Sequence, residues 1–328
     1  MEGKLEQCVQ KETMKNILLQ LSVISFFTCL SFLVKGGEID PESIPANVHR
    51  IVFLGNSITY AGSYITDIEA YFITHYPKRK IEFINVGLPS ETVSGLSEPG
   101  HAGGKFPRPD LHERLERVLA QTKPDLVFAC YGMNDGIYMP FDDERFQKFK
   151  EGITWLHDKV VGSGARIIHV TPPVYDEARG GKSGYSLVLD RYADWLLSQQ
   201  KAATWEVADI HYPMKRYLEE YRQTDPTFAL AEDGIHPGET GHWIMASAIL
   251  AYLGEKDVAN AEDVKATLAS IPNGERIFEL VAHRQSILKD AWLTATGHAR
   301  PGMKTGIPLA EAKSKGKEIE RQIRTLLK

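Results

Sequence analysis

The sequence predicts an α/β fold in which a five-stranded parallel sheet is covered by helices. From Arg50 onward, short runs rich in valine, isoleucine and phenylalanine alternate with longer segments of helical periodicity, which is the pattern of a parallel sheet enclosed between helices. The apolar fraction of 43% and the charged fraction of 25% exclude collagen-like, coiled-coil and wholly disordered chains. At 328 residues, the chain has room for one large domain with appendages or for two domains.

The apolar runs give the positions of the strands, and the periodic segments give the helices. The expected strands are 50–55, 80–86, 125–131, 166–171 and 204–208. The expected helices are near 64–75, 110–121, 142–160, 185–201 and 239–253. Asp110 stands at the start of the second helix, and acidic residues 142–144 stand at the start of the third, where negative charge complements the helix dipole. We interpret the acidic trio as a solvated helix start and not as a metal site.

The first 37 residues indicate export. Residues 17–34 are uncharged and mostly apolar, with Lys11 and Lys15 before them and Lys35 after them. A basic start followed by an apolar run is typical of a secretory signal peptide, and this run is also close to the length that spans a bilayer. We therefore expect residues 1–37 to be a signal peptide or an uncleaved membrane anchor, and the protein to be periplasmic or extracellular.

Charge and cysteine content exclude several kinds of partner and site. The net charge is −5 and the chain has no long basic run, so a nucleic-acid partner is not expected. Cys8, Cys29 and Cys130 lack the spacing of a zinc ribbon or of a disulfide framework. Cys130 lies in the apolar run LVFACY, which favours packing in the core over reactivity.

Three loops that follow predicted strands carry residues suited to chemistry. FLGNSIT ends the first strand with Ser57 at the start of a helix, where the helix terminus stabilises negative charge. NVGLPSET follows the second strand and contains Gly87, which allows a backbone N–H to approach a ligand closely. YGMND follows the third strand and offers the amide of Asn134. Alone, these residues would be read as a helix cap, a turn glycine and a turn asparagine.

A fourth loop supplies a base and its partner. The sequence DGIHP places Asp233 three residues before His236, close enough for the carboxylate to turn back and fix the tautomer of the imidazole. Taken alone, the pair would be an ordinary loop aspartate and loop histidine. In combination with Ser57, it completes the residue types of a serine hydrolase triad.

The order of these four blocks, over about residues 48–254, resembles that of the SGNH (GDSL-type) hydrolases. The resemblance implies a three-layer, flavodoxin-like fold and ester hydrolysis with Ser57 as nucleophile, His236 as general base and Asp233 as its partner. It also implies an oxyanion hole formed by the backbone N–H of Ser57 with Gly87 and Asn134, and it implies no metal or organic cofactor.

Two blocks depart from the family pattern, and two further histidines raise the question of a metal site. Asn56 stands where the family has aspartate, and the second block reads GLPSET where a second glycine is common. Pro89 and Ser90 are expected to reshape the acyl pocket. His211 could pair with Asp209, and His242 follows His236 on the next helix. A histidine-rich metal site is disfavoured because no compact H-E-x-x-H motif is present.

Two long loops bear on the substrate. Residues 96–109 and 175–184 are polar and glycine-rich, and long loops of this kind are often functional, so we expect them over the site. Because neither contains a broad apolar run, a short acyl group on a carbohydrate, most simply acetyl, is favoured. The alternatives are a lipid esterase, lysophospholipase or thioesterase of the same fold, and a non-catalytic glycan-binding protein. A flavodoxin-like cofactor binder is disfavoured because this sequence lacks the glycine-rich phosphate loop of such proteins.

Residues 255–328 form a charged, alanine-rich helical extension to the hydrolase domain. One apolar helix face is expected to pack against that domain; it contains Ile277, Leu280, Val281, Ile287, Leu288 and Trp292. The last stretch, 309–328, is more charged and is expected to project or to pair with a partner. No catalytic residue is expected in the extension, and the sequence leaves the oligomeric state open.

Overall fold

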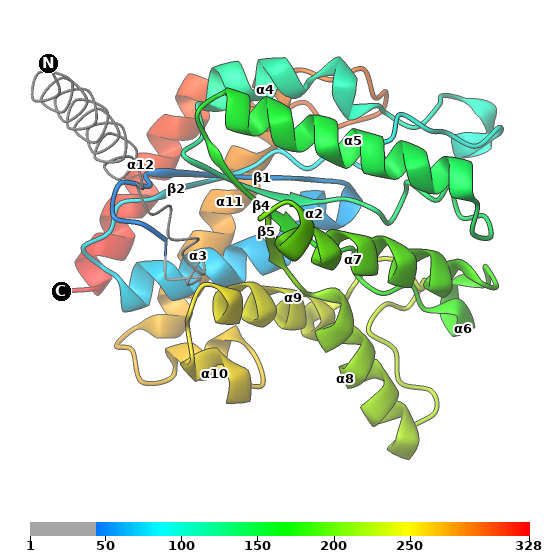
Figure 1. Cartoon of the computed structure of the whole chain (residues 1–328). Coiled ribbons are helices and arrows are strands. Elements are labelled where there is room, and N and C mark those ends of the chain that lie inside the picture. The colour runs from blue at the N-terminus through cyan, green and yellow to red at the C-terminus, as the bar shows by residue number, and fades with distance from the viewer. Residues whose placement is uncertain (1–43) are drawn as a thin grey trace, which may run out of the picture. The chain divides into compact units, whose positions relative to one another are not determined.

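A computed structural model describes residues 44–328, in which a five-stranded parallel sheet organises the chain (Figure 1). The strands are β1 (Arg50–Gly55), β2 (Glu82–Asn85), β3 (Leu126–Cys130), β4 (Arg166–Val170) and β5 (Glu206–Ala208). Their order in the sheet is β2-β1-β3-β4-β5, and every neighbouring pair is parallel. The expected sheet is confirmed. The leader expected at residues 1–37 lies outside the described residues.

Helices cover both faces of the sheet. The longer helices are α3 (Ser63–His75), α4 (Leu115–Thr122), α5 (Asp143–Gly162), α7 (Tyr185–Ala202), α8 (His211–Thr224), α9 (Glu239–Tyr252), α11 (Gly274–Thr296) and α12 (Leu309–Leu326). The short elements are α2 (Ser57–Ala61), α6 (Glu177–Gly180), α10 (Val264–Leu268) and the 3₁₀ turns η1 (His101–Gly104), η2 (Leu111–Glu113) and η3 (Asp257–Asn260). Helices α4 and α5 lie on one face, and α3 and α9 lie on the other (Figure 1). Helix α7 packs against α5, where the ring of Tyr192 stacks on that of Phe149.

The strands are apolar along their whole length because both faces of the sheet are covered. Phe53 of β1 stacks on Phe128 of β3 and on Phe83 of β2, with ring centroids 5.2 and 6.2 Å apart. Cys130 ends β3 with 3% of its surface exposed, and burial raises the pKa of its thiol to about 12. The thiol is therefore a core group, as predicted.

The start of the second predicted helix differs from the expectation. Asp110 caps the 3₁₀ turn η2, where its side chain accepts a hydrogen bond from the backbone N–H of His112, and α4 begins only at Leu115. The backbone leaves helical geometry at Arg114, where φ is −126°. The side chain of Arg114 is fully buried. In contrast, Asp142 caps α5 as its acidic start predicted, by accepting from the backbone N–H of Arg145.

The C-terminal helices pack against the rest of the described chain. Helix α11 contacts α3, α4 and β2, and α12 packs along α11. The packed face of α12 contains Ala312, Gly316, Ile319 and Ile323, so the expectation that this stretch projects is wrong: its small and branched residues recur at helical spacing. Residues Ser43–Lys328 form one compact unit. Within residues 44–328, no helix has the length and apolarity needed to cross a membrane.

Candidate active site

Three side chains from two distant loops form a continuous chain of hydrogen bonds beyond the carboxyl end of the sheet. Ser57 Oγ lies 2.8 Å from His236 Nε2, although 179 positions separate them in the sequence. His236 Nδ1 lies 2.6 Å from Asp233 Oδ2. With the proton on Nδ1, the imidazole donates to the carboxylate, and Nε2 accepts from the serine hydroxyl. The structure thus brings together the three side chains that the sequence analysis grouped.

The position of Ser57 is set by the turn between β1 and α2. Asn56 caps α2 through its side-chain oxygen, which accepts from the backbone N–H of Ile58 at 3.1 Å. Ser57 is the first residue of α2, and the N–H of a first helical residue has no acceptor within its own helix. Asparagine therefore fulfils the capping role at the position where the family has aspartate, and it leaves the N–H of Ser57 free to bind a ligand.

The loop that carries Asp233 and His236 is held by a tight local turn. Asp233 Oδ1 accepts from the backbone N–H groups of Ile235 and His236, at 2.9 and 2.8 Å. Desolvation raises the pKa of the Asp233 carboxyl, but the hydrogen bonds from the side chain and backbone of His236 and from Ile235 outweigh it, so the pKa lies below its ordinary value. Asp233 therefore stays ionised as the partner of an imidazolium.

The loop 175–184 packs against this turn and supports it. Gly234 has φ +77°, and a Cβ there would lie 2.4 Å from the backbone nitrogen of Gly180. The carbonyl of Gly234 accepts from the backbone N–H of Asp176 at 3.0 Å, and Asp176 in turn binds Arg222 of α8 at 2.6 Å. The loop 175–184, expected over the site, thus braces the turn that carries the histidine.

The dyad of Asp233 and His236 is open to solvent. The Asp233 side chain is 54% exposed and the His236 side chain 49%. Proteins that act on small substrates commonly enclose them in a deep cavity, whereas an exposed dyad can be reached by a group attached to a large molecule. This openness bears on the substrate.

Asn134 lies at the end of β3 with both ends of its amide fixed. Its Nδ2 donates to the backbone carbonyl of Glu91 at 3.1 Å, and its Oδ1 accepts from the hydroxyl of Tyr138 at 3.2 Å. The adjacent Asp135 accepts from the backbone N–H groups of Val93, Ser94 and Gly132, each at 2.9 Å. The amide orientation is therefore determined by the loops after β2 and β3, and one N–H of Nδ2 remains for a ligand.

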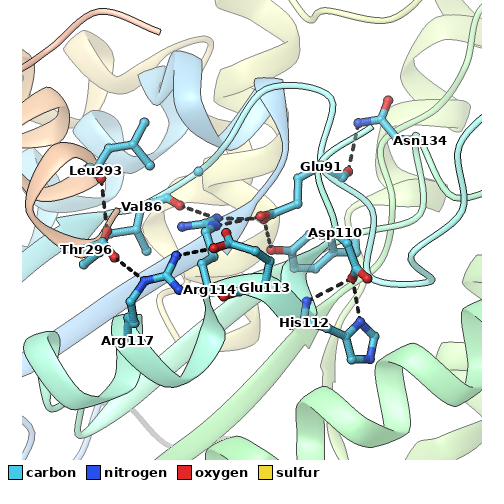
Figure 2. Close-up of polar contacts among 12 residues, drawn as sticks. Val86, Glu91, Asp110, His112, Glu113, Arg114, Arg117, Asn134, Leu293 and Thr296 are labelled. Atoms are coloured by element: carbon cyan, nitrogen blue, oxygen red, sulfur yellow. Dashed lines mark hydrogen bonds and ion pairs between the residues drawn. The ribbon is translucent and has the colours of Figure 1, made fainter. Parts of the chain in front are cut away.

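A buried ion pair holds the loop after β2 in place (Figure 2). Glu91 forms two hydrogen bonds to Arg114, at 2.6 and 2.7 Å, and neither side chain has exposed surface. Arg114 also donates to the carbonyl of Val86, and Tyr131 donates to Glu91. Because the carbonyl of Glu91 is the acceptor for Asn134, this pair connects α4 to the asparagine at the rim of the site.

Gly87 does not serve as the expected oxyanion donor. Its N–H donates to Asn85 Oδ1 at 2.9 Å, and a Cβ at this position would lie 2.4 Å from the backbone nitrogen of Tyr60. Gly87 is needed for close packing against α2, and its N–H is already used. Ser90, three residues later, has φ +68°, a left-handed conformation rare for serine, and no hydrogen bond from its N–H is found in the described chain.

Sequence reasoning missed the residues that surround Asn134. Tyr138 and its neighbour Ile137 both have positive φ, +56° and +47°, and such strain clusters at functional sites. The Tyr138 ring stacks on Tyr185 at 4.8 Å, and the guanidinium of Arg108 lies 5.2 Å from its centroid. Positive φ at an isoleucine and a tyrosine leaves no sequence signal, whereas the absence of a second glycine from the block GLPSET was visible in the sequence.

Arg108 brings the loop 96–109 to the rim of the site, where it was expected. The guanidinium binds Glu98 through Nε and Nη2, at 2.6 and 2.8 Å. Its Nη1 reaches the carbonyl of Ser90 at 3.5 Å. The arginine thereby fastens this loop to the turn that contains Ser90, next to Asn134.

The remaining histidines do not join the triad. His211 Nε2 binds Asp190 at 2.9 Å, not Asp209 as expected, because Asp209 accepts from Thr171 and from the backbone of Tyr212. Burial, aided by the charge of His236, lowers the pKa of His242 to about 4. In residues 44–328 no three histidine, cysteine or carboxylate side chains converge in a way that could hold a metal ion.

Sequence comparison identifies a family and a relative of this chain. Residues 53–244 match the model of the GDSL-like lipase/acylhydrolase family. An acetylxylan esterase of Geobacillus stearothermophilus is 25% identical over 234 residues, which cover 62% of this chain and 94% of that enzyme.

Solved structures share the fold. BT4096, a gut microbial diltiazem-metabolizing enzyme, is 26% identical with a TM-score of 0.51; the match covers 65% of this chain but only 49% of that one. Axe2, an acetylxylan esterase from Geobacillus stearothermophilus, is 24% identical with a TM-score of 0.51, over 68% of this chain and 100% of Axe2. Because the family model spans more than half of the sequence, the chain belongs to the GDSL-like lipase/acylhydrolase family and is a carboxylic ester hydrolase.

Proposed function

We propose that the protein is an exported serine esterase that removes short acyl groups, most simply acetyl, from carbohydrate. The observation that carries the catalytic part of this proposal is the hydrogen-bonded chain Ser57–His236–Asp233, with Ser57 Oγ and His236 Nε2 2.8 Å apart. A serine hydroxyl is a weak nucleophile unless a positioned base accepts its proton, and this chain provides that base.

The reaction follows from the positions of these atoms. Ser57 Oγ attacks the ester carbonyl carbon while His236 Nε2 takes the hydroxyl proton, and Asp233 stabilises the imidazolium that forms. Collapse of the tetrahedral intermediate breaks the bond to the alcohol oxygen, to which His236 returns the proton. Water then attacks the acyl-serine with the same base, and the carboxylic acid leaves.

Negative charge on the carbonyl oxygen requires fixed donors. We assign this role to the backbone N–H of Ser57 and the second N–H of the Asn134 amide, together with the N–H of Ser90 in place of that of Gly87. The N–H of Gly87 is bound to Asn85, whereas that of Ser90 belongs to a turn fastened by Arg108. Each such donor contributes roughly 3 kcal/mol of transition-state stabilisation in comparable sites.

The open dyad favours an acyl group carried on a large, hydrated molecule. A long acyl chain needs an extended apolar channel to leave water, and the loops that reach the site are held by polar contacts such as Arg108–Glu98 and Asp176–Arg222. The similarity to an acetylxylan esterase points to the same class of substrate. Export through the leader at residues 1–37 would give the enzyme access to an extracellular or envelope polysaccharide.

Hydrolysis of p-nitrophenyl acetate tests the mechanism. Ser57→Ala and His236→Ala should each lower kcat by roughly a thousandfold or more, while Ser198→Ala, at an exposed serine of α7, should leave kcat unchanged. Full activity in either triad variant would disprove the mechanism.

A substrate panel tests the specificity separately. Acetylated xylo-oligosaccharides should be preferred over p-nitrophenyl esters of increasing chain length. A preference for long acyl chains would replace the carbohydrate assignment with a lipid esterase, and would leave the roles of Ser57 and His236 intact.

A further inference from the structure

A basic groove lies at the end of the sheet opposite the candidate active site. It has a volume of about 1000 Å³ and is bordered by the first residues of β1 and β2 and by α11 and α12. Eight lysines and arginines and three glutamates line it, a formal excess of five positive charges in a chain whose net charge is −5. Positive charge is therefore concentrated here against the sign of the whole protein.

Helix α12 forms one wall of the basic groove. Lys313, Lys317, Arg321 and Arg324 line it from successive turns of this helix. At 1.5 Å per residue, these cations are spread over roughly 17 Å, with one or more on each turn of about 5.4 Å. A row of charges along a groove matches a linear ligand that carries negative charge at regular intervals.

Three of the lining cations have no partner within the described chain. Lys80, Lys317 and Lys328 form no ion pair or side-chain hydrogen bond with residues 44–328. Arg284, at the floor of the groove, is by contrast held by Glu69 at 2.7 Å and by Glu320. The floor is thus neutralised internally, and the charge of the three lysines remains available to an external anion.

The lining residues also discriminate among polyanions. Sequence-independent binding of single-stranded nucleic acid uses aromatic side chains on which bases stack. Among the described residues that line the groove, Phe83 is 4% exposed, His49 is the one other aromatic ring, and there is no tyrosine or tryptophan. A linear polyanion without bases fits this lining better, and a polysaccharide with carboxylate groups is one.

We propose that the basic groove is a second carbohydrate-binding site, which holds a run of uronate sugars in the polysaccharide that is deacylated at Ser57. The choice of a polysaccharide rests on the proposed function. Retention of one part of a polymer raises the effective concentration of its other parts at the same protein. The site would therefore favour esters on acidic polysaccharides over free small esters.

Isothermal titration calorimetry of the full chain with polygalacturonate at low salt tests this site. The double variant Lys80→Gln/Lys317→Gln should weaken binding roughly tenfold, from the loss of two exposed ion pairs. The control Lys201→Gln/Lys256→Gln removes the same charge from exposed positions outside the groove and should bind as the wild type does. Both should hydrolyse p-nitrophenyl acetate at the wild-type rate.

The possible outcomes separate the groove from the esterase. Absence of polygalacturonate binding by the wild type, or equal loss in the control variant, would overturn the proposal. Equal or tighter binding of a thymidine oligonucleotide would also overturn it, in favour of a nucleic-acid site. Ser57→Ala should still bind polygalacturonate, so failure of the esterase mechanism and failure of the groove proposal are measured independently.

Discussion

Tyr138 is the residue whose contacts determine how Asn134 presents its amide. Its hydroxyl donates to Asn134 Oδ1 at 3.2 Å, and this leaves Nδ2 facing the carbonyl of Glu91 and the site. Tyr138→Phe should lower kcat for p-nitrophenyl acetate roughly tenfold, because an oxyanion donor that can rotate loses part of its preorganisation. KM should change little. The measurement is a comparison of kcat and KM with those of Tyr217→Phe, which removes a hydroxyl on α8; an unchanged kcat for Tyr138→Phe would remove Tyr138 from the positioning of the amide.

The pair Glu91–Arg114 is a structural element of the site. Arg114→Met should lower the free energy of unfolding by roughly 3–5 kcal/mol, because it leaves a fully buried carboxylate without its partner. The double variant Glu91→Gln/Arg114→Met should recover much of that loss, since both charges are then removed. Urea unfolding monitored by tryptophan fluorescence measures both. A double variant as unstable as the single one would show that packing, and not the unpaired charge, is decisive.

Individual site residues differed in how far the sequence could reveal them. Ser57, Asp233 and His236 were grouped correctly in space because the loops after parallel strands meet at one edge of the sheet. The donor role of Gly87 was wrong because the acceptor of its N–H is the side chain of Asn85, a contact made only after the turn has closed. The role of Tyr138 depends on the positive φ angles of Ile137 and Tyr138, which no local sequence pattern predicts.

Between helices, the clearest electrostatic feature is Asp67 of α3, which is 7% exposed. Burial, followed by the carboxylates of Asp263 and Glu239, raises the pKa of Asp67 to about 7. Between about pH 4 and pH 7 the folded protein retains a proton that the unfolded chain releases, so this group lowers the free energy of unfolding as the pH rises.

Asp67→Asn should therefore stabilise the protein more at pH 8 than at pH 5. The gain in free energy of unfolding is expected to differ between pH 5 and pH 8 by on the order of 3 kcal/mol, because the pKa of Asp67 is raised by about three units. Chemical unfolding of both proteins at the two pH values measures it, with the exposed Asp158→Asn as control. Equal stabilisation at pH 5 and pH 8 would contradict a buried, protonated Asp67.

Elements with strong periodicity were predicted well, and weakly patterned ones were not. The strands and the helices α3, α5, α7 and α9 were found within a few residues of their bounds because each buries a regular apolar set. Helix α8 was missed because it is polar and buries only His211, Met214 and Leu218. The late start of α4 was missed because it depends on the burial of Arg114, a tertiary contact.

At the scale of the whole molecule, the C-terminal helices share the core of the hydrolase. Ile323 of α12 has no exposed surface, and Arg284 of α11 binds Glu69 of α3 at 2.7 Å. The hydroxyl of Tyr60, one turn after Ser57, donates to Asp290 of α11 at 2.9 Å. These contacts connect α11 to α3 and to the helix that carries the nucleophile, and α11 also packs against β2 and α12.

Because residues Ser43–Lys328 form one compact unit, loss of α12 packing should also destabilise the active site. Ile323→Ala should destabilise the protein by roughly 2–5 kcal/mol, from lost burial and the cavity that remains. It should shift a single calorimetric transition to lower temperature, and esterase activity should disappear within that same transition. If α12 were an independent appendage, a separate low-temperature transition would appear in the variant while activity persisted beyond it. The coincidence of the two losses therefore distinguishes a shared core from an attached tail.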